Sequence, residues 1–169
     1  MEKYLFLDFD GVLNTGSYAK YLTKKGIDPY DAFGPMFDPM AIDNLRNIVE
    51  QTGCKMVLSS TWRNEGLIQM RALWKDRNLP GELFSMTPIL LSTTYRDAQS
   101  GEMFGMAERS AKALEINAWL LRHASGTSRY VILDDENVFF QSQQEHLIQT
   151  DAYVGLTANK AQFAIDVLN

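Results

Sequence analysis

The sequence predicts an α/β fold, a three-layer Rossmann-like parallel sheet with helices on both faces. Short apolar runs typical of buried strands alternate along the chain with longer segments that have a helical period. Acidic residues follow two of these runs directly, one after Leu7 and one after Leu133. Ligands in open α/β sheets bind outside the carboxyl ends of the strands, so both acid pairs should meet at one edge of this sheet. With 169 residues, 46% of them hydrophobic, the chain suits a single domain spanning residues 1–169.

The first strand is predicted at residues 4–7 and ends at Asp8-Phe9-Asp10, with Gly11 as the turn. Residues i and i+2 of a strand share a face, so Asp8 and Asp10 should project together. Two acids placed together where a buried strand stops repel each other, and a hard cation such as Mg²⁺ offsets that repulsion. The alternative is a loop that holds two turn-forming aspartates.

Residues 15–37 are polar, aromatic and rich in Gly and Pro, and they are too few for an independent cap domain. A helix follows, with Asp38 as its N-cap, Pro39 in its first turn and Gly53 as its stop. The second strand is predicted at residues 55–58 and ends at Ser59-Ser60. Both serines should therefore lie at the same edge of the sheet as the acids.

The second half of the chain repeats this alternation. We predict a helix at 65–78, a short strand at 89–91, a polar loop or small flap at 92–108, and a helix at 110–123. The strand at 130–133 ends at Asp134-Asp135, and a short strand is expected at 146–149. Thr157 is the expected N-cap of a terminal helix.

Four of these segments together resemble the motifs of the haloacid-dehalogenase (HAD) superfamily of phosphohydrolases. They are residues 8–14, the strand ending at Ser59-Ser60, Lys112 near a helix start, and Asp134-Asp135. More narrowly, three segments are similar to a small uncapped bacterial subgroup, some members of which are found with RNA-repair proteins. They are residues 59–63, Lys112 with residues 115–116 and 119–120, and residues 146–147 followed by 155–157. The resemblance implies an HAD-like fold without a large cap domain, with only small inserts near 15–37 and 92–108.

The resemblance also assigns roles to the acids. Asp8 would be the nucleophile that forms an aspartyl-phosphate, and Asp10 would protonate the leaving oxygen and then activate water. We expect Asp10 to be partly desolvated, under the tyrosine-rich segment. Mg²⁺ would be held by Asp8, the backbone carbonyl of Asp10, and Asp134. Asp135 is a further ligand, an outer partner through water, or a helix N-cap.

Basic and hydroxyl side chains would complete the catalytic set. Ser59, or Ser60 as the competing choice, would bind a phosphoryl oxygen. Lys112 would stabilise the nucleophile and the charge on the transferred group, and Arg109, about one turn earlier, is the alternative.

Three further residues are candidates for substrate binding, each with an ordinary structural alternative. Arg63 could grip a second anionic group, or it could be a surface arginine. Asn14 could contact substrate or form a turn. Trp62 could stack on a base or sugar, although core packing is the more common fate of a tryptophan.

These residues predict a Mg²⁺-dependent phosphohydrolase with an open active site. Its substrate would be a phosphorylated small molecule, a nucleotide, a nucleic-acid end or a phosphoprotein. The alternatives are a receiver-like phosphorylatable signalling domain and a catalytically silent HAD-fold binding module.

Composition limits the kinds of partner, metal site and cellular location that we expect. A net charge of −5 argues against a broad basic surface for nucleic acid. One cysteine excludes an internal disulfide, and two histidines disfavour a His/Cys zinc site. The sequence has neither a signal peptide nor an apolar run long enough to span a bilayer, so we expect a cytoplasmic protein without membrane contact. The oligomeric state is not predicted.

Overall fold

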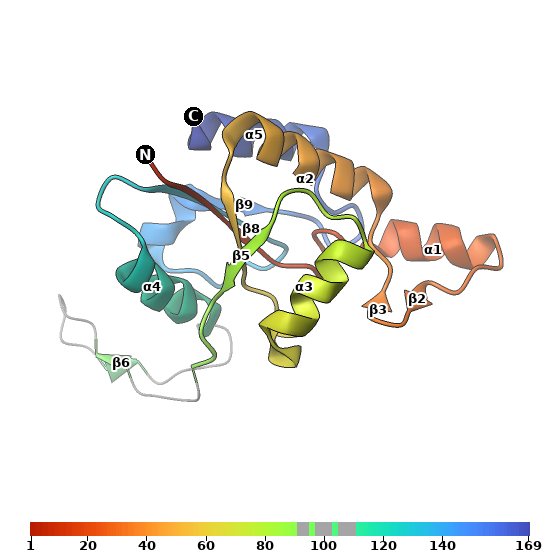
Figure 1. Cartoon of the computed structure of the whole chain (residues 1–169), viewed down its shortest axis with the longest axis horizontal. Helices are drawn as coiled ribbons and strands as arrows, with labels where there is room; N and C mark the ends of the chain where they lie inside the picture. Colours follow the sequence, from red (N-terminus) through yellow and green to blue (C-terminus); the bar gives the residue numbers. More distant parts are fainter. Residues whose placement is uncertain (91–94, 97–102, 105–110) are drawn as a thin grey trace.

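The computed structural model describes residues 1–90, 95–96, 103–104 and 111–169 (Figure 1). Its centre is a five-stranded sheet in the order β5-β4-β1-β8-β9, and every neighbouring pair is parallel. The strands are β1 (Lys3–Leu7), β4 (Lys55–Leu58), β5 (Leu83–Met86), β8 (Arg129–Asp134) and β9 (Leu147–Gln149). The predicted parallel α/β sheet is confirmed. Numbered one to five along the chain, these strands lie in the order 3-2-1-4-5 across the sheet. Receiver domains have the order 2-1-3-4-5, so the receiver alternative is wrong.

Alternate residues of the strands face two separate cores, as the period of a strand requires. Leu5 and Leu7 pack with α2 (Pro39–Thr52), α3 (Leu67–Asp76) and α5 (Ala158–Leu168). Tyr4 and Phe6 point the other way, toward α4 (Ala111–His123), where Trp119 is buried. In Figure 1, α2 and α5 lie above the sheet and α4 lies below it. The predicted three layers are therefore present.

Side-chain caps fix the helix starts where the sequence indicated them. Asp38 accepts a hydrogen bond from the Met40 backbone N–H, and Pro39 occupies the first turn of α2. Gly53 ends that helix in the left-handed conformation, with φ of 64°. Thr157 caps α5 by accepting from the Lys160 N–H.

Residues 15–37 hold more structure than the sequence predicted. Thr15 caps α1 (Gly16–Lys24), a helix the sequence analysis missed because Leu22 is its one buried residue and no apolar stripe marks it. A short hairpin follows within the small insert that the resemblance implied, as β2 (Tyr30–Asp31) paired with β3 (Gly34–Pro35). The segment after β4 begins with a 3₁₀ helix, η1 (Thr61–Glu65), and Gly66 separates it from α3.

The short strand predicted at 89–91 is wrong for the part that the structure describes. The strand in this part of the chain is β5, which lies earlier, at 83–86, and Ser85 interrupts its apolar run. Ile89 is 52% exposed, and Leu91 lies outside the described residues. Within the insert expected at 92–108, β6 (Tyr95–Arg96) pairs with β7 (Met103–Phe104). The 3₁₀ helix η3 (Gln141–His146) leads into β9. No helix in the described ranges is long and apolar enough to cross a membrane.

Candidate active site

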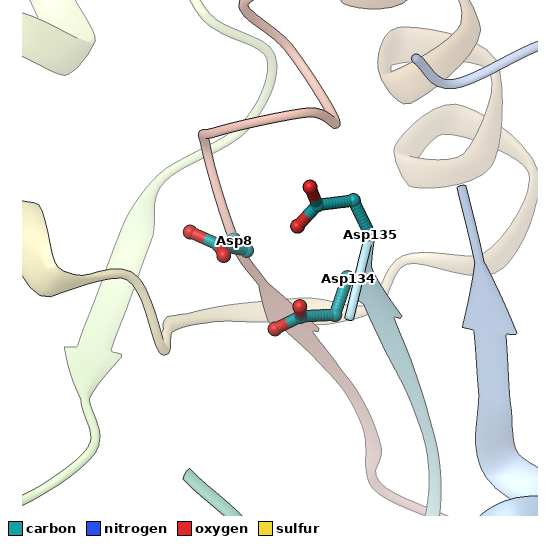
Figure 2. A group of neighbouring side chains, drawn as sticks. All are labelled: Asp8, Asp134 and Asp135. Carbon is teal, nitrogen blue, oxygen red and sulfur yellow. The ribbon is translucent and has the colours of Figure 1, made fainter. Parts of the chain in front are cut away.

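Three aspartates meet where β1 and β8 end (Figure 2). The two strands pair with Leu7 opposite Leu133, and the Asp8 N–H donates to the Leu133 carbonyl at 3.0 Å. Asp8, Asp134 and Asp135 each offer a carboxylate oxygen, and these oxygens lie within 4.8 Å of one another. The structure thus brings the two predicted acid pairs together, except that the Asp10 side chain is not in this group.

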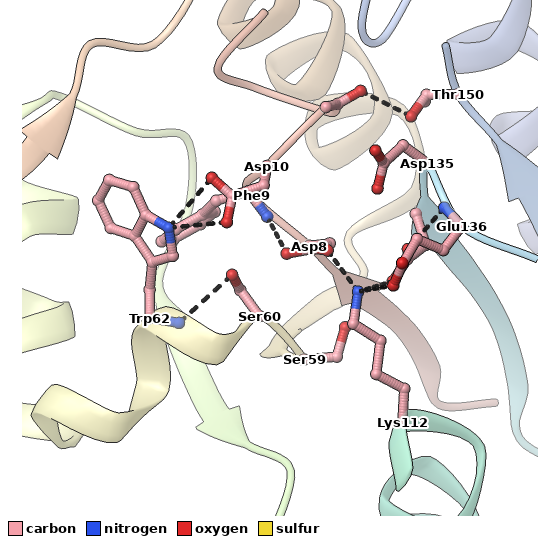
Figure 3. Close-up of polar contacts among 12 residues, drawn as sticks. Asp8, Phe9, Asp10, Ser59, Ser60, Trp62, Lys112, Asp135, Glu136 and Thr150 are labelled. Carbon is pink, nitrogen blue, oxygen red and sulfur yellow. Dashed lines mark hydrogen bonds and ion pairs between the residues drawn. The ribbon is translucent and has the colours of Figure 1, made fainter. Parts of the chain in front are cut away.

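Lys112, in the first turn of α4, joins two of these aspartates (Figure 3). Its Nζ lies 2.5 Å from Asp8 Oδ2 and 2.8 Å from Asp134 Oδ2, with Glu136 Oε2 at 3.5 Å. Burial alone would lower the pKa of the Lys112 ammonium, but the charges of Asp8 and Asp134 raise it above its usual range. Arg109, the alternative to Lys112 as the positively charged residue of the site, lies outside the described residues.

The lysine does not neutralise the whole cluster. Burial and the charge of Asp8 raise the pKa of Asp134 to about 7, although Lys112 opposes the shift. The same two causes raise the pKa of Asp135 above its usual value. This excess negative charge, carried by oxygen ligands, fits a hard divalent cation such as Mg²⁺.

The backbone around Asp135 favours a role in that cluster over a helix cap. No helix begins at Asp135 in the described chain, and the next helical element is η3 at Gln141. Gly11 has φ of +66°, and a Cβ added there would lie 2.5 Å from Asp135 Oδ2. The turn after β1 can therefore approach this carboxylate closely only with glycine at that position.

Asp10 is exposed, which corrects the expectation of a desolvated acid under the tyrosine-rich segment. The turn carries it away from the buried end of β1, where Trp62 flanks it (Figure 3). The Trp62 indole N–H donates to its carboxylate at 3.1 and 3.2 Å, and Asn14 Nδ2 donates at 2.6 Å. Asn14 Oδ1 also accepts from the Gly11 N–H, so Asn14 holds the turn, and the Thr150 hydroxyl fixes it further by donating to the Gly11 carbonyl at 2.8 Å.

The two serines after β4 are both buried but differ in their partners. Ser60 Oγ accepts from the Trp62 backbone N–H as the cap of η1. Ser59 Oγ has no hydrogen-bond partner among the residues with described positions. A buried hydroxyl without a partner is rare, and it agrees with Ser59 as the hydroxyl that binds a phosphoryl oxygen.

Arg63 lies beneath the serine loop, not on a surface where it could grip a second anionic group. Its side chain is 6% exposed and pairs with the buried Glu115 of α4. Its Nη1 donates to the carbonyls of Ser59 and Ser60, at 3.1 and 2.7 Å. Glu115 also accepts from the Leu90 N–H at 3.2 Å. Arg63 and Glu115 both fall in segments of the narrower resemblance, which was the one indication in the sequence that they belong to the site.

A comparison with known families accounts for this arrangement. The family model described as "HAD domain in Swiss Army Knife RNA repair proteins" matches residues 4–161. No curated protein and no solved structure matches the chain. The matched range includes each residue of the site described above, from Asp8 to Thr150.

Proposed function

Because this chain belongs to the family of HAD domains in Swiss Army Knife RNA repair proteins, we propose that it is a magnesium-dependent phosphohydrolase that cleaves phosphomonoesters through an aspartyl-phosphate. The observation that carries the proposal is the Lys112 ammonium shared by Asp8 and Asp134 at two adjacent strand ends. A positioned cation beside a carboxylate nucleophile is what phosphoryl transfer needs, since its catalysis depends on positioning and charge stabilisation.

In the first step, a carboxylate oxygen of Asp8 attacks phosphorus. The Asp8–phosphorus bond forms as the bond to the leaving oxygen breaks. The Phe9 N–H donates to Asp8 Oδ1 at 2.7 Å, and with Lys112 it holds the carboxylate in one orientation. Lys112 and the Ser59 hydroxyl stabilise the charge on the phosphoryl oxygens.

Asp10 moves the protons. It gives a proton to the leaving oxygen in the first step. In the second step it removes a proton from the water that attacks phosphorus, which breaks the bond to Asp8 and releases inorganic phosphate. The hydrogen bonds from Trp62 and Asn14 keep the Asp10 carboxylate in place for both transfers.

The metal would be held by the carboxylates of Asp8, Asp134 and Asp135, with the backbone carbonyl of Asp10 as a further ligand. When bound, Mg²⁺ would offset the negative charge of the phosphoryl group. The raised pKa values of Asp134 and Asp135 support this assignment, because both carboxyls lack enough positive charge around them.

We propose a nucleic-acid end or a nucleotide as the substrate. The family description names RNA repair, and a site at the sheet edge without a large cap domain leaves room for a long chain. Capped relatives enclose small metabolites, so this openness favours the larger substrate.

The test uses chelator-treated protein with p-nitrophenyl phosphate, with and without Mg²⁺. Asp8→Asn should abolish turnover with the fold intact, because it removes the charge of the nucleophile and keeps its size. Asp43→Asn, at an exposed position on α2, is the matched control. Near-wild-type hydrolysis by Asp8→Asn would remove Asp8 from the mechanism. A panel of 3′- and 5′-phosphorylated oligonucleotides, run beside phosphorylated metabolites, then tests the substrate class.

A further inference from the structure

A groove of about 610 Å³ lies beside the candidate site, between the β2–β3 hairpin and the η1–α3 segment. Phe33 and Pro35 line it from the hairpin, Trp62 and Asn64 from η1, and Gln69 from α3. Its volume falls in the range of about 300–1,000 Å³ that is typical of small-molecule sites.

One wall of the groove contacts the acid that serves the leaving group. Trp62 forms part of its wall and also donates its indole N–H to Asp10 at 3.1 Å (Figure 3). In the proposed reaction Asp10 protonates the leaving oxygen. A leaving group protonated by Asp10 can therefore extend past Trp62 into the groove that Trp62 lines.

The walls of the groove are held in place before any ligand arrives. Arg77 donates to Asp31 Oδ1 at 2.6 Å and to the Gly34 carbonyl at 3.3 Å, which ties the hairpin to the end of α3. Its guanidinium lies 5.5 Å from the centre of the Trp62 ring. A Cβ added at Gly34 would lie 3.1 Å from that ring, so the hairpin backbone packs directly on the indole. A preformed site loses less entropy when it binds a ligand.

The lining selects against a second phosphate and for a neutral aromatic group. Neither lysine nor arginine is among the described residues of the lining, and Glu65 is the one ionisable side chain there. Phe33 and Trp62 supply aromatic surface, and aromatic side chains are the usual stacking partners of bases. The exposed amides of Asn64 and Gln69 offer both donors and acceptors, as the edge of a base requires.

We propose that this groove binds the nucleobase of the terminal nucleotide whose phosphate is cleaved at Asp8. The inference rests on the proposed function for the position of the phosphate, and it adds the recognition of the base. Stacking with a base is worth at least about fivefold in binding, so a substrate that lacks its terminal base should be hydrolysed less efficiently.

The kinetic test compares 3′- and 5′-phosphorylated dinucleotides with versions that are abasic at the phosphorylated position. The readout is kcat/KM for the intact substrate divided by kcat/KM for its abasic version. Phe33→Ala should lower this ratio at least about fivefold, because it removes one of the two aromatic side chains of the lining. Tyr30→Ala is the matched control, since Tyr30 is an exposed aromatic of the same hairpin, 61% exposed, that does not line the groove. For Gln69→Ala the control is Ile68→Ala, at the adjacent and 85% exposed position.

A binding test separates the groove from the reaction. Nucleosides without phosphate, at millimolar concentration, should shift the NMR signal of the Trp62 indole N–H. The indole N–H groups of Trp74 and Trp119, which donate to the Pro80 carbonyl and to Ser85 Oγ inside the fold, should not move. Trp62→Phe assigns the signal.

The outcomes separate the two proposals. An unmoved Trp62 signal, or an unchanged ratio in Phe33→Ala, would overturn base binding in the groove even if the protein is a phosphatase. A shifted Trp62 signal in a protein that hydrolyses none of these substrates would support the groove and overturn the proposed function.

Discussion

Replacing Asp134 with asparagine should stabilise the metal-free protein at pH 8 and weaken its response to magnesium. Asp134 is fully buried, and burial together with the Asp8 charge raises its pKa to about 7. The folded protein therefore keeps a proton between about pH 4 and pH 7 that the unfolded chain has lost. A carboxyl whose pKa is raised by folding contributes stability at low pH, and that contribution is lost as the pH rises through this window.

The size of the effect follows from the shift. Each pH unit in the window costs about 1.4 kcal/mol, and a rise from the ordinary value of 3.8 to about 7 amounts to about 4 kcal/mol in all. Asparagine resembles the protonated acid, and its side-chain oxygen can still accept from the Glu136 N–H, which now lies 3.0 Å from Asp134 Oδ1. The variant gives up the ion pair with Lys112, so about 4 kcal/mol is the upper limit of the gain.

Urea denaturation at pH 5 and pH 8, in chelator and in Mg²⁺, measures this prediction. In chelator the variant should exceed the wild type in stability by less than about 2 kcal/mol at pH 5, where the window has only begun, and by up to about 4 kcal/mol at pH 8. Magnesium should stabilise the wild type, more at pH 8 than at pH 5, because at low pH it must displace the Asp134 proton. Asp43→Asn should follow the wild type throughout. A variant that is less stable than the wild type at pH 8 in chelator would refute the reasoning.

Three further predictions concern the groups around the aspartates. Lys112→Met should lower the single-turnover rate constant for p-nitrophenyl phosphate about 10²–10³-fold, because it removes the cation beside the nucleophile. A smaller loss would leave Lys112 a structural role. Arg63→Met should cost about 3–5 kcal/mol in urea denaturation, because Glu115 stays buried without its partner, and adding Glu115→Leu should recover most of that loss if the pair is its cause. Trp62→Phe should slow the hydrolysis of alkyl phosphates more than that of p-nitrophenyl phosphate, because only the former need Asp10 as an acid; equal losses would show that the indole N–H does not act through Asp10.

Local signals predicted most of the fold. The strands that end at Asp8 and Asp134 are continuous apolar runs, and α2 carries its own cap and stop in Asp38 and Gly53. The failures occur where burial is slight or mixed. The helix α1 buries only Leu22, and β5 contains Ser85. In both segments the tertiary contacts, not the local pattern, decide the conformation.

The site was predicted as far as the motifs are local. Asp8, Lys112 and Asp134 could be placed together because each is tied to the end of a strand or the start of a helix. Arg63 and Trp62 could not be assigned, because their partners are remote. Arg63 pairs with Glu115 and Trp62 with Asp10, and each contact joins residues 52 positions apart. A sequence shows the type of such a residue, but only the fold shows what it touches.

Asp8 and Asp10 show how the fold gives different tasks to identical side chains. The alternation of a strand predicts a shared face, but β1 ends at Leu7, so that rule stops applying before either acid. Asp8 stays at the buried strand end, 4% exposed and paired with Lys112, which fixes its position as a nucleophile requires. The turn at Gly11 carries Asp10 into solvent, where it can exchange protons with a leaving group and with water. Two carboxyls whose surroundings differ this much can divide nucleophile from acid–base work, and that division is the physical basis of the proposed two-step reaction.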